Sequence, residues 1–362
     1  MTSHRPLVDA LLRWYATAQR DLPWRRTRDP YAIWLSEVML QQTQVATVIP
    51  YWERFLARFP TVESLAETEL ADVLPFWSGL GYYSRARALH RAAGLMARDH
   101  AGQLPRTAVE LRELPGFGPY TAGAVASIAF SERTPIVDGN VVRVLSRLFA
   151  VEGDPSTKPV RDRLWALAAE LVPAGAPGAF NQALMELGAL VCTSRQPACL
   201  VCPVRSSCQA LRLGRVGELP SRKARPMRKV LTWTSAFVER KGEILLARRP
   251  ESGLFSGLWE LPSAEGDATS LQALVGPRVA LGKPLGRIER VLSHRDLAIT
   301  VVLGTLRGPA PALPSYLERC WVPGAKVSER GMATAMRACL ELALGTATSL
   351  LRSSGSARPR RR

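Results

Sequence analysis

The sequence predicts two domains of different class, an all-α domain followed by a smaller α+β domain. Its 362 residues exceed the length of one ordinary domain. Up to residue 213 the apolar residues recur at helical spacing, and short Gly/Pro breaks separate the segments. Beyond residue 230 apolar and polar residues alternate, which is typical of strands. We therefore expect domains at 1–213 and 230–345, a basic linker at 214–229 and a disordered basic tail at 346–362.

The first predicted domain is a series of helices. Asp29-Pro30 has the pattern of an N-cap followed by proline at the first helical position, and it opens a helix that runs to about Val48. Strand-like alternation is nearly absent before residue 213. The other helices expected from apolar spacing are Tyr51–Phe59, Ser84–Asp99, Thr107–Leu114, Thr121–Phe130, Asn140–Phe149, Val160–Leu171 and Ala179–Val191.

The second predicted domain mixes strands with a helix. Thr232–Val238 and Ile244–Arg248 alternate on either side of a Lys241-Gly242 turn, which predicts a β-hairpin. Leu297–Leu303 predicts another strand, and Met332–Leu344 predicts a helix. Together these elements define an α+β domain.

The chain carries a large excess of positive charge. Lys+Arg 48 against Asp+Glu 31 gives a net charge of +17. This excess favours a polyanionic partner, most simply nucleic acid, although a solvated basic surface has the same composition. The first residues lack the pattern of a secretory signal, and no apolar run is long enough to span a bilayer. We expect a cytoplasmic monomer with no membrane contact.

Four cysteines form a compact array. Cys192, Cys199, Cys202 and Cys208 have the spacing C-x6-C-x2-C-x5-C. In a reducing compartment such clusters ligate metal rather than pair with each other, and one tight pair with two wider arms favours a [4Fe–4S] cluster over the paired knuckles of zinc sites. Zinc and incidental thiols are the alternatives. Cys320 and Cys339 lack such neighbours and are expected to be buried apolar residues.

A glycine-containing stretch, LPGFGPYTA, lies between two predicted helices. Gly116 and Gly118 permit positive φ and close approach, so backbone N–H groups at the next helix start can face a phosphate oxygen. A lone G-x-G is usually only a turn. Between two helices, however, this string predicts a helix–hairpin–helix element that grips DNA without reading its sequence.

Two carboxylates are candidates for catalysis. Glu37 lies among apolar residues in SEVMLQQTQ, and Asp138 lies directly after the hairpin's second helix. An exposed glutamate and a simple helix cap are the structural alternatives. Cleavage of an N-glycosidic bond needs an acid that protonates the leaving base and an ionised carboxylate that stabilises the sugar cation. A buried Glu37 would suit the first task, because desolvation raises a carboxyl pKa.

Taken together, these motifs resemble the adenine DNA glycosylase (MutY) family of the endonuclease III-like helix–hairpin–helix superfamily. The similarity extends over Val8–Leu344. It rests jointly on SEVMLQQTQV, GLGYYSRAR, LPGFGPYTA, VDGNVVRV, FNQALMELGALVC and the cysteine array.

The resemblance implies a role for each matching residue. Glu37 protonates the flipped adenine at N7, and Asp138 stabilises the oxocarbenium ion, through a transient covalent sugar adduct. Asn140 and Tyr120 orient these two groups. Trp24, Arg25 and Gln182 line the adenine pocket, while Gln42, Thr43 and Tyr82 contact or wedge into the duplex where the base is extruded. Without the family, Trp24 and Tyr82 could equally be core residues.

The hairpin lacks the amine that a lyase needs. Bifunctional relatives carry a lysine nucleophile in the position held here by Tyr120, and no lysine precedes Lys158. A Schiff-base lyase requires such an amine. The resemblance therefore predicts a monofunctional enzyme that leaves an abasic site.

The second domain resembles a Nudix fold. Residues 253–262, GLFSGLWELP, resemble the start of the MutT-like C-terminal domain of this family, yet residues 263–282 lack the acidic helix that holds Mg²⁺ in Nudix hydrolases. The resemblance implies recognition of 8-oxoguanine opposite the target adenine. Ser293 and His294 match the loop residues that contact the oxidised base, and Leu292 replaces the phenylalanine common in the family. An ordinary surface turn is the alternative.

The predicted function is removal of adenine from 8-oxoguanine:adenine or guanine:adenine mispairs in double-stranded DNA. A thymine mismatch glycosylase or an oxidised-pyrimidine lyase on the same scaffold is disfavoured by Glu37 and the Nudix-like domain. A non-catalytic iron–sulfur DNA-binding protein would need neither Glu37 nor Asp138. A Nudix phosphohydrolase is disfavoured by the missing metal-binding helix.

Overall fold

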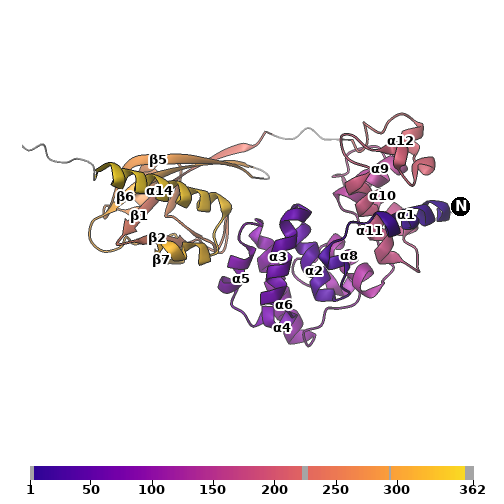
Figure 1. The fold of residues 1–362 in the computed structure, drawn as a ribbon, viewed down its shortest axis with the longest axis horizontal. Coiled ribbons are helices and arrows are strands. Elements are labelled where there is room, and N and C mark those ends of the chain that lie inside the picture. The colour runs from indigo at the N-terminus through magenta and orange to yellow at the C-terminus, as the bar shows by residue number, and fades with distance from the viewer. Residues whose placement is uncertain (1–3, 222–226, 293–294, 355–362) are drawn as a thin grey trace, which may run out of the picture. The chain divides into compact units, whose positions relative to one another are not determined.

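The computed structural model describes residues 4–221, 227–292 and 295–354. The chain folds into two compact units (Figure 1). The first comprises Met1–Thr68 and Ser84–Arg225, and the second comprises Glu69–Tyr83 and Pro226–Arg362. The domain boundaries expected from the sequence stay a prediction.

The first unit is helical in its described residues, as the sequence predicts. Helix α2 (Pro30–Leu40) begins after Asp29, whose carboxylate accepts hydrogen bonds from the backbone N–H groups of Tyr31 and Ala32, as expected of an N-cap. The other helices are α1 (Arg5–Ala18), α3 (Val45–Arg58), α4 (Val62–Ala66), α6 (Tyr83–Asp99), α7 (Ala108–Leu111), α8 (Pro119–Phe130), α9 (Gly139–Leu148), α10 (Lys158–Leu171), α11 (Pro177–Leu190) and α12 (Gln209–Arg212). Short 3-10 turns lie at η1 (Pro23–Arg25), η2 (Cys199–Val201) and η3 (Arg205–Ser207).

Two helices are buried on nearly every side. In α2 every residue from Tyr31 to Met39 is buried, and in α8 the same holds from Thr121 to Ser127. Both sequences are apolar all round, so neither helix has a face that prefers water. By contrast, α9 packs one apolar face against α11, with Leu145 and Leu187 in the same core. A polar side chain in the middle of α2 must therefore lie inside the protein.

The segment predicted as one helix up to Val48 is broken after α2. Gln42 adopts φ 58°, which ends the helix before α3 begins. The cause lies in α6, where the buried Arg85 guanidinium donates hydrogen bonds to carbonyl oxygens that end α2. The prediction of a continuous helix was wrong because no local signal reveals this contact. The acceptors are the carbonyl oxygens of Val38, Met39 and Gln41, at 2.8, 2.9 and 2.6 Å.

The glycine stretch forms the predicted hairpin between α7 and α8. Gly116 has φ +83°, and a Cβ added there would lie 2.8 Å from the Ala88 Cβ. Gly118, which precedes α8 as its N-cap, has φ −74°. The expectation of positive φ therefore holds for Gly116 and was wrong for Gly118. At Gly118 the missing side chain instead leaves open space, since an added Cβ would meet nothing within 4 Å.

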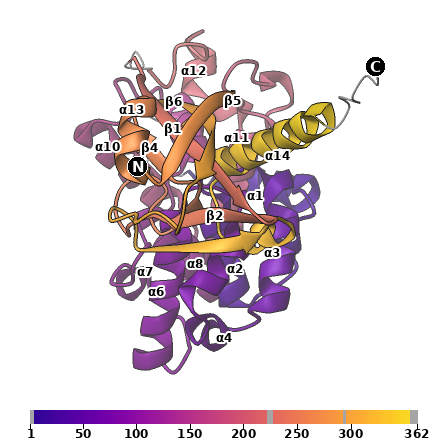
Figure 2. The same cartoon turned by 90° about the vertical axis from the view of Figure 1, so that its left-hand side faces the viewer.

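The second unit is built on a sheet that contains seven strands in the described residues. Their order is β3-β2-β1-β6-β5, with β4 paired to β1 and β7 paired to β2. Figure 2 shows β2 and β7 side by side. The strands are β1 (Lys229–Arg240), β2 (Glu243–Arg248), β3 (Trp259–Glu260), β4 (Ser263–Glu265), β5 (Val279–Val291), β6 (Arg295–Leu306) and β7 (Glu318–Pro323). The helices are α5 (Leu70–Trp77), α13 (Ala268–Val275), α14 (Thr334–Ser354) and the 3-10 turn η4 (Gly324–Glu329).

The predicted fold class, helical and then sheet-containing, is confirmed. The hairpin of β1 and β2 turns at Lys241 and Gly242, both with positive φ, as two-residue hairpin turns require. Strand β5 was not predicted, because its exposure does not alternate cleanly and its pairing with β6 shifts register around Pro284. The predicted helix Met332–Leu344 is observed as α14.

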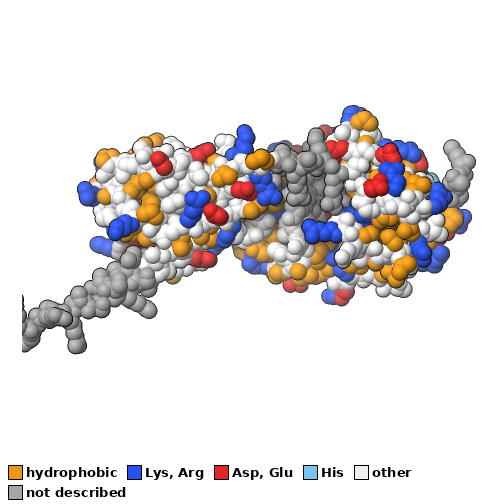
Figure 3. Space-filling model, turned by 90° about the horizontal axis from the view of Figure 1, so that it is seen from above, with side chains coloured by type: hydrophobic (Ala, Val, Ile, Leu, Met, Phe, Trp, Pro, Cys, Tyr) orange, Lys and Arg blue, Asp and Glu red, His pale blue; other side chains and the backbone are white. Residues whose placement is uncertain are grey.

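Basic side chains are spread over the surface. Figure 3 shows Lys and Arg side chains on this face of both units, which fits the net charge of +17. Among the described residues, no helix is both long enough and apolar enough to cross a membrane.

The two hairpin glycines provide a matched test of this backbone geometry. Gly116→Ala should destabilise the first unit by about 1–3 kcal/mol, because alanine is strained at positive φ and its Cβ meets Ala88. Gly118→Ala should change stability by less than about 0.5 kcal/mol. Urea unfolding followed by helical circular dichroism measures both. Equal destabilisation by the two substitutions would contradict this assignment.

Candidate active site

Glu37 is a buried carboxyl group in the middle of α2. Its side chain is only 5% exposed, because the helix is covered on all sides. The pKa of Glu37 is raised to about 7, mainly by burial and in smaller part by the charge of Asp138. A hydrogen bond from Tyr120 and the charge of Arg25 oppose this rise without cancelling it. Glu37 therefore holds a proton up to near-neutral pH and is equipped as a general acid.

Tyr120 stands directly against Glu37. It lies in the first turn of α8, immediately after the hairpin, and its hydroxyl donates a 2.6 Å hydrogen bond to Glu37 Oε2. The same hydroxyl lies 3.3 Å from Met185 Sδ of α11. The residue that follows the hairpin thus places a hydrogen-bond donor against the Glu37 carboxyl group.

Asp138 is both a helix cap and a member of the site. Its Oδ1 accepts a 2.7 Å hydrogen bond from the Val141 N–H at the start of α9, and its Oδ2 accepts a 2.9 Å bond from Asn140 Nδ2. Burial raises the pKa of Asp138, while these bonds favour its charged form. The charge of Asp138 acts on both Glu37 and Tyr120, so the three groups lie close together. The alternative of an exposed glutamate is wrong, because Glu37 is buried, whereas Asp138 does cap α9.

Asn140 is held in turn by α9 and α11. Arg143 donates from Nη2 to Asn140 Oδ1 at 2.8 Å and to the Gly188 carbonyl at 2.7 Å. A Cβ at Gly188 would lie 2.6 Å from the Asn140 Cβ, so only glycine permits this approach of the two helices. Asp138 and Asn140 are therefore fixed by a network whose Arg143 the sequence analysis did not mark.

Trp24 and Arg25 lie in η1, and Gln182 lies on α11. Trp24 is buried and makes an edge-to-face contact with Trp52, with ring centroids 5.9 Å apart. Arg25 lies near enough to Glu37 for its charge to lower the pKa of Glu37. Gln182 is half-buried. The sequence analysis missed Glu186, four residues after Gln182 on the same helix, to which Arg25 is paired.

The expected wedge residues belong to different units. Gln42 and Thr43 lie in the turn between α2 and α3, where Gln42 is exposed and Thr43 Oγ1 accepts a 3.3 Å hydrogen bond from Arg85 Nη2. Tyr82 belongs to the second unit, is 42% exposed and has φ 48°. Its exposure argues against an ordinary core role. Ser293 and His294 lie outside the described residues.

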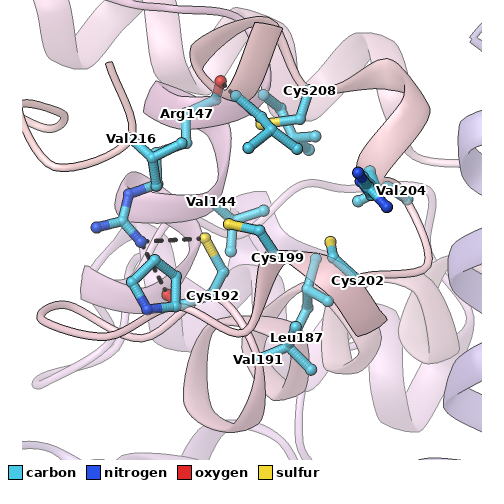
Figure 4. A pocket seen from close by; sticks show the side chains of 14 residues that line it. Val144, Arg147, Leu187, Val191, Cys192, Cys199, Cys202, Val204, Cys208 and Val216 are labelled. Carbon is cyan, nitrogen blue, oxygen red and sulfur yellow. Dashed lines mark hydrogen bonds between the residues drawn. The ribbon is translucent and has the colours of Figure 1, made fainter. Parts of the chain in front are cut away.

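Four cysteines line one pocket at the far end of α11. Figure 4 shows Cys192, Cys199, Cys202 and Cys208 around a space bordered by apolar residues such as Val144 and Leu187. All four are half-buried, and Cys202 interacts electrostatically with the other three. As the structure stands, no group of three or more His, Cys, Asp or Glu side chains among the described residues is arranged to hold a metal ion.

The chemistry of this pocket nevertheless suits an all-sulfur ligand set. Its walls are apolar, and Arg147 Nη1 donates a 3.3 Å hydrogen bond to Cys192 Sγ. Such bonds to ligand sulfurs are typical of iron–sulfur sites. Outside the pocket, Cys339 is buried as expected, whereas Cys320 is only half-buried.

The fold and the site define a base excision DNA glycosylase. Residues 35–170 match the HhH-GPD superfamily base excision DNA repair proteins, and residues 234–342 match the NUDIX domain. A solved thermostable thymine-DNA glycosylase superposes with a TM-score of 0.54 at 32% identity, covering 58% of this chain and 97% of that one. An endonuclease III–DNA complex, at 23% identity and a TM-score of 0.50 over 59% of this chain and 99% of that one, shares the fold.

Curated relatives narrow the class to one family. The adenine DNA glycosylase of Rattus norvegicus is 40% identical over 391 residues, which cover 90% of this chain and 76% of the relative. The Homo sapiens enzyme is 38% identical over 394 residues, covering 91% and 72%. That of Buchnera aphidicola subsp. Baizongia pistaciae is 33% identical over 297 residues, covering 81% and 84%. The chain belongs to the adenine DNA glycosylase family, and the predicted resemblance is confirmed.

A buried acid with a raised pKa lowers stability, and Glu37→Gln should reveal this. In the folded protein the pKa of Glu37 is about 7, above the ordinary value of 4.5. The contribution of Glu37 to the free energy of unfolding is therefore most favourable below pH 4.5 and falls as pH rises to 7. Glu37→Gln removes this loss, which is on the order of 3 kcal/mol. The variant should therefore exceed the wild type in urea stability at pH 8 and gain much less at pH 5.

The exposed Asp21→Asn substitution serves as the control, because Asp21 lies at the surface. It should give no such pH-dependent gain. A Glu37→Gln stability difference that is the same at both pH values would contradict a buried, protonated Glu37.

Proposed function

We propose that this DNA glycosylase hydrolyses adenine from 8-oxoguanine:adenine mispairs, and less efficiently from guanine:adenine mispairs, and leaves an abasic site. The observation that carries the proposal is the buried Glu37, bonded to Tyr120 and within electrostatic reach of Asp138. Adenine is a poor leaving group until a ring nitrogen is protonated, and Glu37 supplies the acid. Family membership at 33–40% identity supports the same substrate.

The two carboxyl groups divide the reaction between them. Glu37 donates its proton to adenine N7, and the Tyr120 hydroxyl fixes the carboxyl during the transfer. As the glycosidic bond breaks, the ionised Asp138 faces the oxocarbenium sugar and captures it transiently before water completes hydrolysis. The Val141 N–H and Asn140 amide hold Asp138 in place, and its position at the start of α9 favours its charge.

A lyase step is disfavoured by the hairpin. Tyr120 has a phenol where a Schiff base would need an amine, and no lysine precedes Lys158 in the chain. Thymine would leave as a ring anion and gains little from an acid placed for adenine N7, so Glu37 favours adenine despite the similarity to a thymine-DNA glycosylase. In the Nudix-like region, α13 carries no acidic residue, which disfavours phosphohydrolysis.

The exposed elements supply the contacts to double-stranded DNA. The Gly116 and Gly118 hairpin presents backbone N–H groups to one phosphate, while Gln42, Thr43 and Tyr82 support the extruded state. Ser293 and His294 read the oxidised base, and Leu292 gives that loop an aliphatic neighbour. We propose that the enzyme acts as a monomer on the chromosome in the cytoplasm, without membrane contact.

The cysteine pocket is proposed to hold a [4Fe–4S] cluster. Cys192, Cys199, Cys202 and Cys208 would be its ligands. When bound, the cluster would cross-link the loop, a structural role that requires no redox step. The loop and α12 then present the exposed Arg195, Arg205 and Arg212 to DNA phosphates.

A labelled duplex with one 8-oxoguanine:adenine pair tests the function. The wild type should release adenine, and the strand should break only after alkali treatment. Glu37→Gln should slow release by about 100-fold or more, the contribution expected of a general acid, and Asp138→Asn should also lose release. Both variants should retain duplex binding, measured by gel shift.

A guanine:thymine duplex is the matched control substrate and should stay intact after alkali. Strand breaks without alkali would refute the monofunctional assignment. Loss of binding by both variants would make the two carboxylates structural, and thymine release would favour the alternative glycosylase.

Metal analysis tests the cluster. The purified protein should contain about four irons and four acid-labile sulfides per chain and absorb visible light broadly. Cys202→Ser should lower the iron content, while Cys320→Ser, outside the pocket, should leave it unchanged. One zinc per chain, with no sulfide, would replace the cluster assignment with a zinc site.

A further inference from the structure

Glu186 is a buried carboxylate that the proposed mechanism does not use. Its side chain is 1% exposed, and it lies on α11 next to Met185, whose sulfur contacts the Tyr120 hydroxyl. Because Gln182 is four residues earlier, it shares the same face of the helix as Glu186. Burying a charge is costly unless partners compensate it. The partners of Glu186 therefore indicate its role.

Two arginines bind Glu186 at once. Arg20 donates to it from its backbone N–H at 2.8 Å, from Nε at 3.0 Å and from Nη2 at 2.7 Å. Arg25 donates from Nη1 to Oε1 and from Nη2 to Oε2, each at 3.0 Å. Although burial opposes ionisation, these bonds bring the pKa of Glu186 down to about 2. Glu186 is therefore an anion at every pH at which the enzyme works.

The Arg25 guanidinium is held in a fixed orientation by this pairing. Its side chain is 12% exposed, it donates a further 2.9 Å bond to the Arg20 carbonyl, and it lies over the Tyr15 ring at 5.5 Å. Both ends of its planar fork are thus engaged by one carboxylate. This geometry leaves Arg25 committed to α1, η1 and α11 rather than to α2.

The pairing of Arg25 with Glu186 matters because the positive charge of Arg25 also acts on Glu37. The groups that act on Glu37 are Tyr120 from α8, Asp138 from the start of α9 and Arg25 from η1. A guanidinium near a carboxyl group favours its ionised form and commonly lowers its pKa by about one to three units. Without the negative charge of Glu186, the charge of Arg25 would no longer be neutralised and would lower the pKa of Glu37 more strongly.

We propose that Glu186 is a positioning residue that holds and neutralises the Arg25 guanidinium and so preserves the acid proton of Glu37 needed for adenine release. This inference rests on the proposed function, because it assigns the proton to that reaction. It predicts that Arg25 and Glu186 affect Glu37 in opposite directions, which a merely structural ion pair would not do.

The test is the pH profile of adenine release under single-turnover conditions, from about pH 5 to about pH 9. Activity requires protonated Glu37, so the wild-type rate should fall as pH rises through about 7. We call this fall of the rate at high pH the alkaline limb. In Glu186→Gln the alkaline limb should shift to lower pH by about one unit or more, because no carboxylate then neutralises the charge of Arg25. In Arg25→Gln the limb should move up, whatever the loss in maximal rate.

Two further variants separate electrostatics from folding. Glu186→Asp keeps the charge and should hold the limb near its wild-type position. The Arg25→Gln/Glu186→Gln double variant lacks the Arg25 guanidinium, so its alkaline limb should lie at the same pH as that of Arg25→Gln. If Glu186→Gln does not fold, restored folding and an upward limb in the double variant would support the same role. Failure of both to fold would make Glu186 structural and overturn the proposal.

Asp21→Asn is the matched control, since Asp21 also pairs with an arginine, Arg26, but at the surface. Its limb should coincide with the wild type. An unchanged or upward limb in a folded Glu186→Gln variant would overturn this proposal alone. Absence of adenine release by the wild type would instead overturn the proposed function.

Discussion

The desolvation of one carboxyl group governs this molecule. Glu37 lies in a helix that has no water-facing side, and the protein can keep it there at low cost only with its proton attached. The same condition that makes Glu37 expensive to ionise makes it useful to a departing base. The surrounding elements either contact the Glu37 carboxyl group or hold the negative charge of Asp138 at a fixed place. α8 brings Tyr120 against Glu37, and α9 begins at Asp138.

The two carboxyl groups differ because their backbones differ. Asp138 precedes a helix and receives a backbone N–H and an amide, which favour its anion. Glu37 lies within a helix whose N–H groups are already bonded, so no backbone donor is free for it. An acid and a stabilising anion can therefore coexist in one site at one pH. The separation of roles is a property of local secondary structure as much as of distance.

Much of this arrangement can be predicted from short stretches of the sequence. The cap at Asp29, the apolar surroundings of Glu37 and the hairpin glycine Gly116 were predicted from neighbouring residues, and the cap at Asp138 was weighed as an alternative. The positive-φ turn at Lys241-Gly242 was equally local.

What escaped prediction depends on residues far apart in the chain. Arg85 ends a helix more than 40 positions earlier, and Glu186 binds arginines more than 160 positions away. Neither partner leaves a periodic signal. Side chains that organise a site from a distance are therefore the least visible in a single sequence.

Arg143 joins the two chemical parts of the first unit. One edge of its guanidinium holds the Asn140 amide oxygen, and its Nε donates to the Cys192 carbonyl at 2.7 Å. One turn further along α9, Arg147 bonds the Thr193 carbonyl and the Cys192 sulfur. The same short helix thus supports both Asp138, the proposed catalytic aspartate, and the cysteine loop. Because Arg143 bonds both Asn140 and the Cys192 carbonyl, a rearrangement of the cysteine loop would also alter the support of the Asp138 side chain.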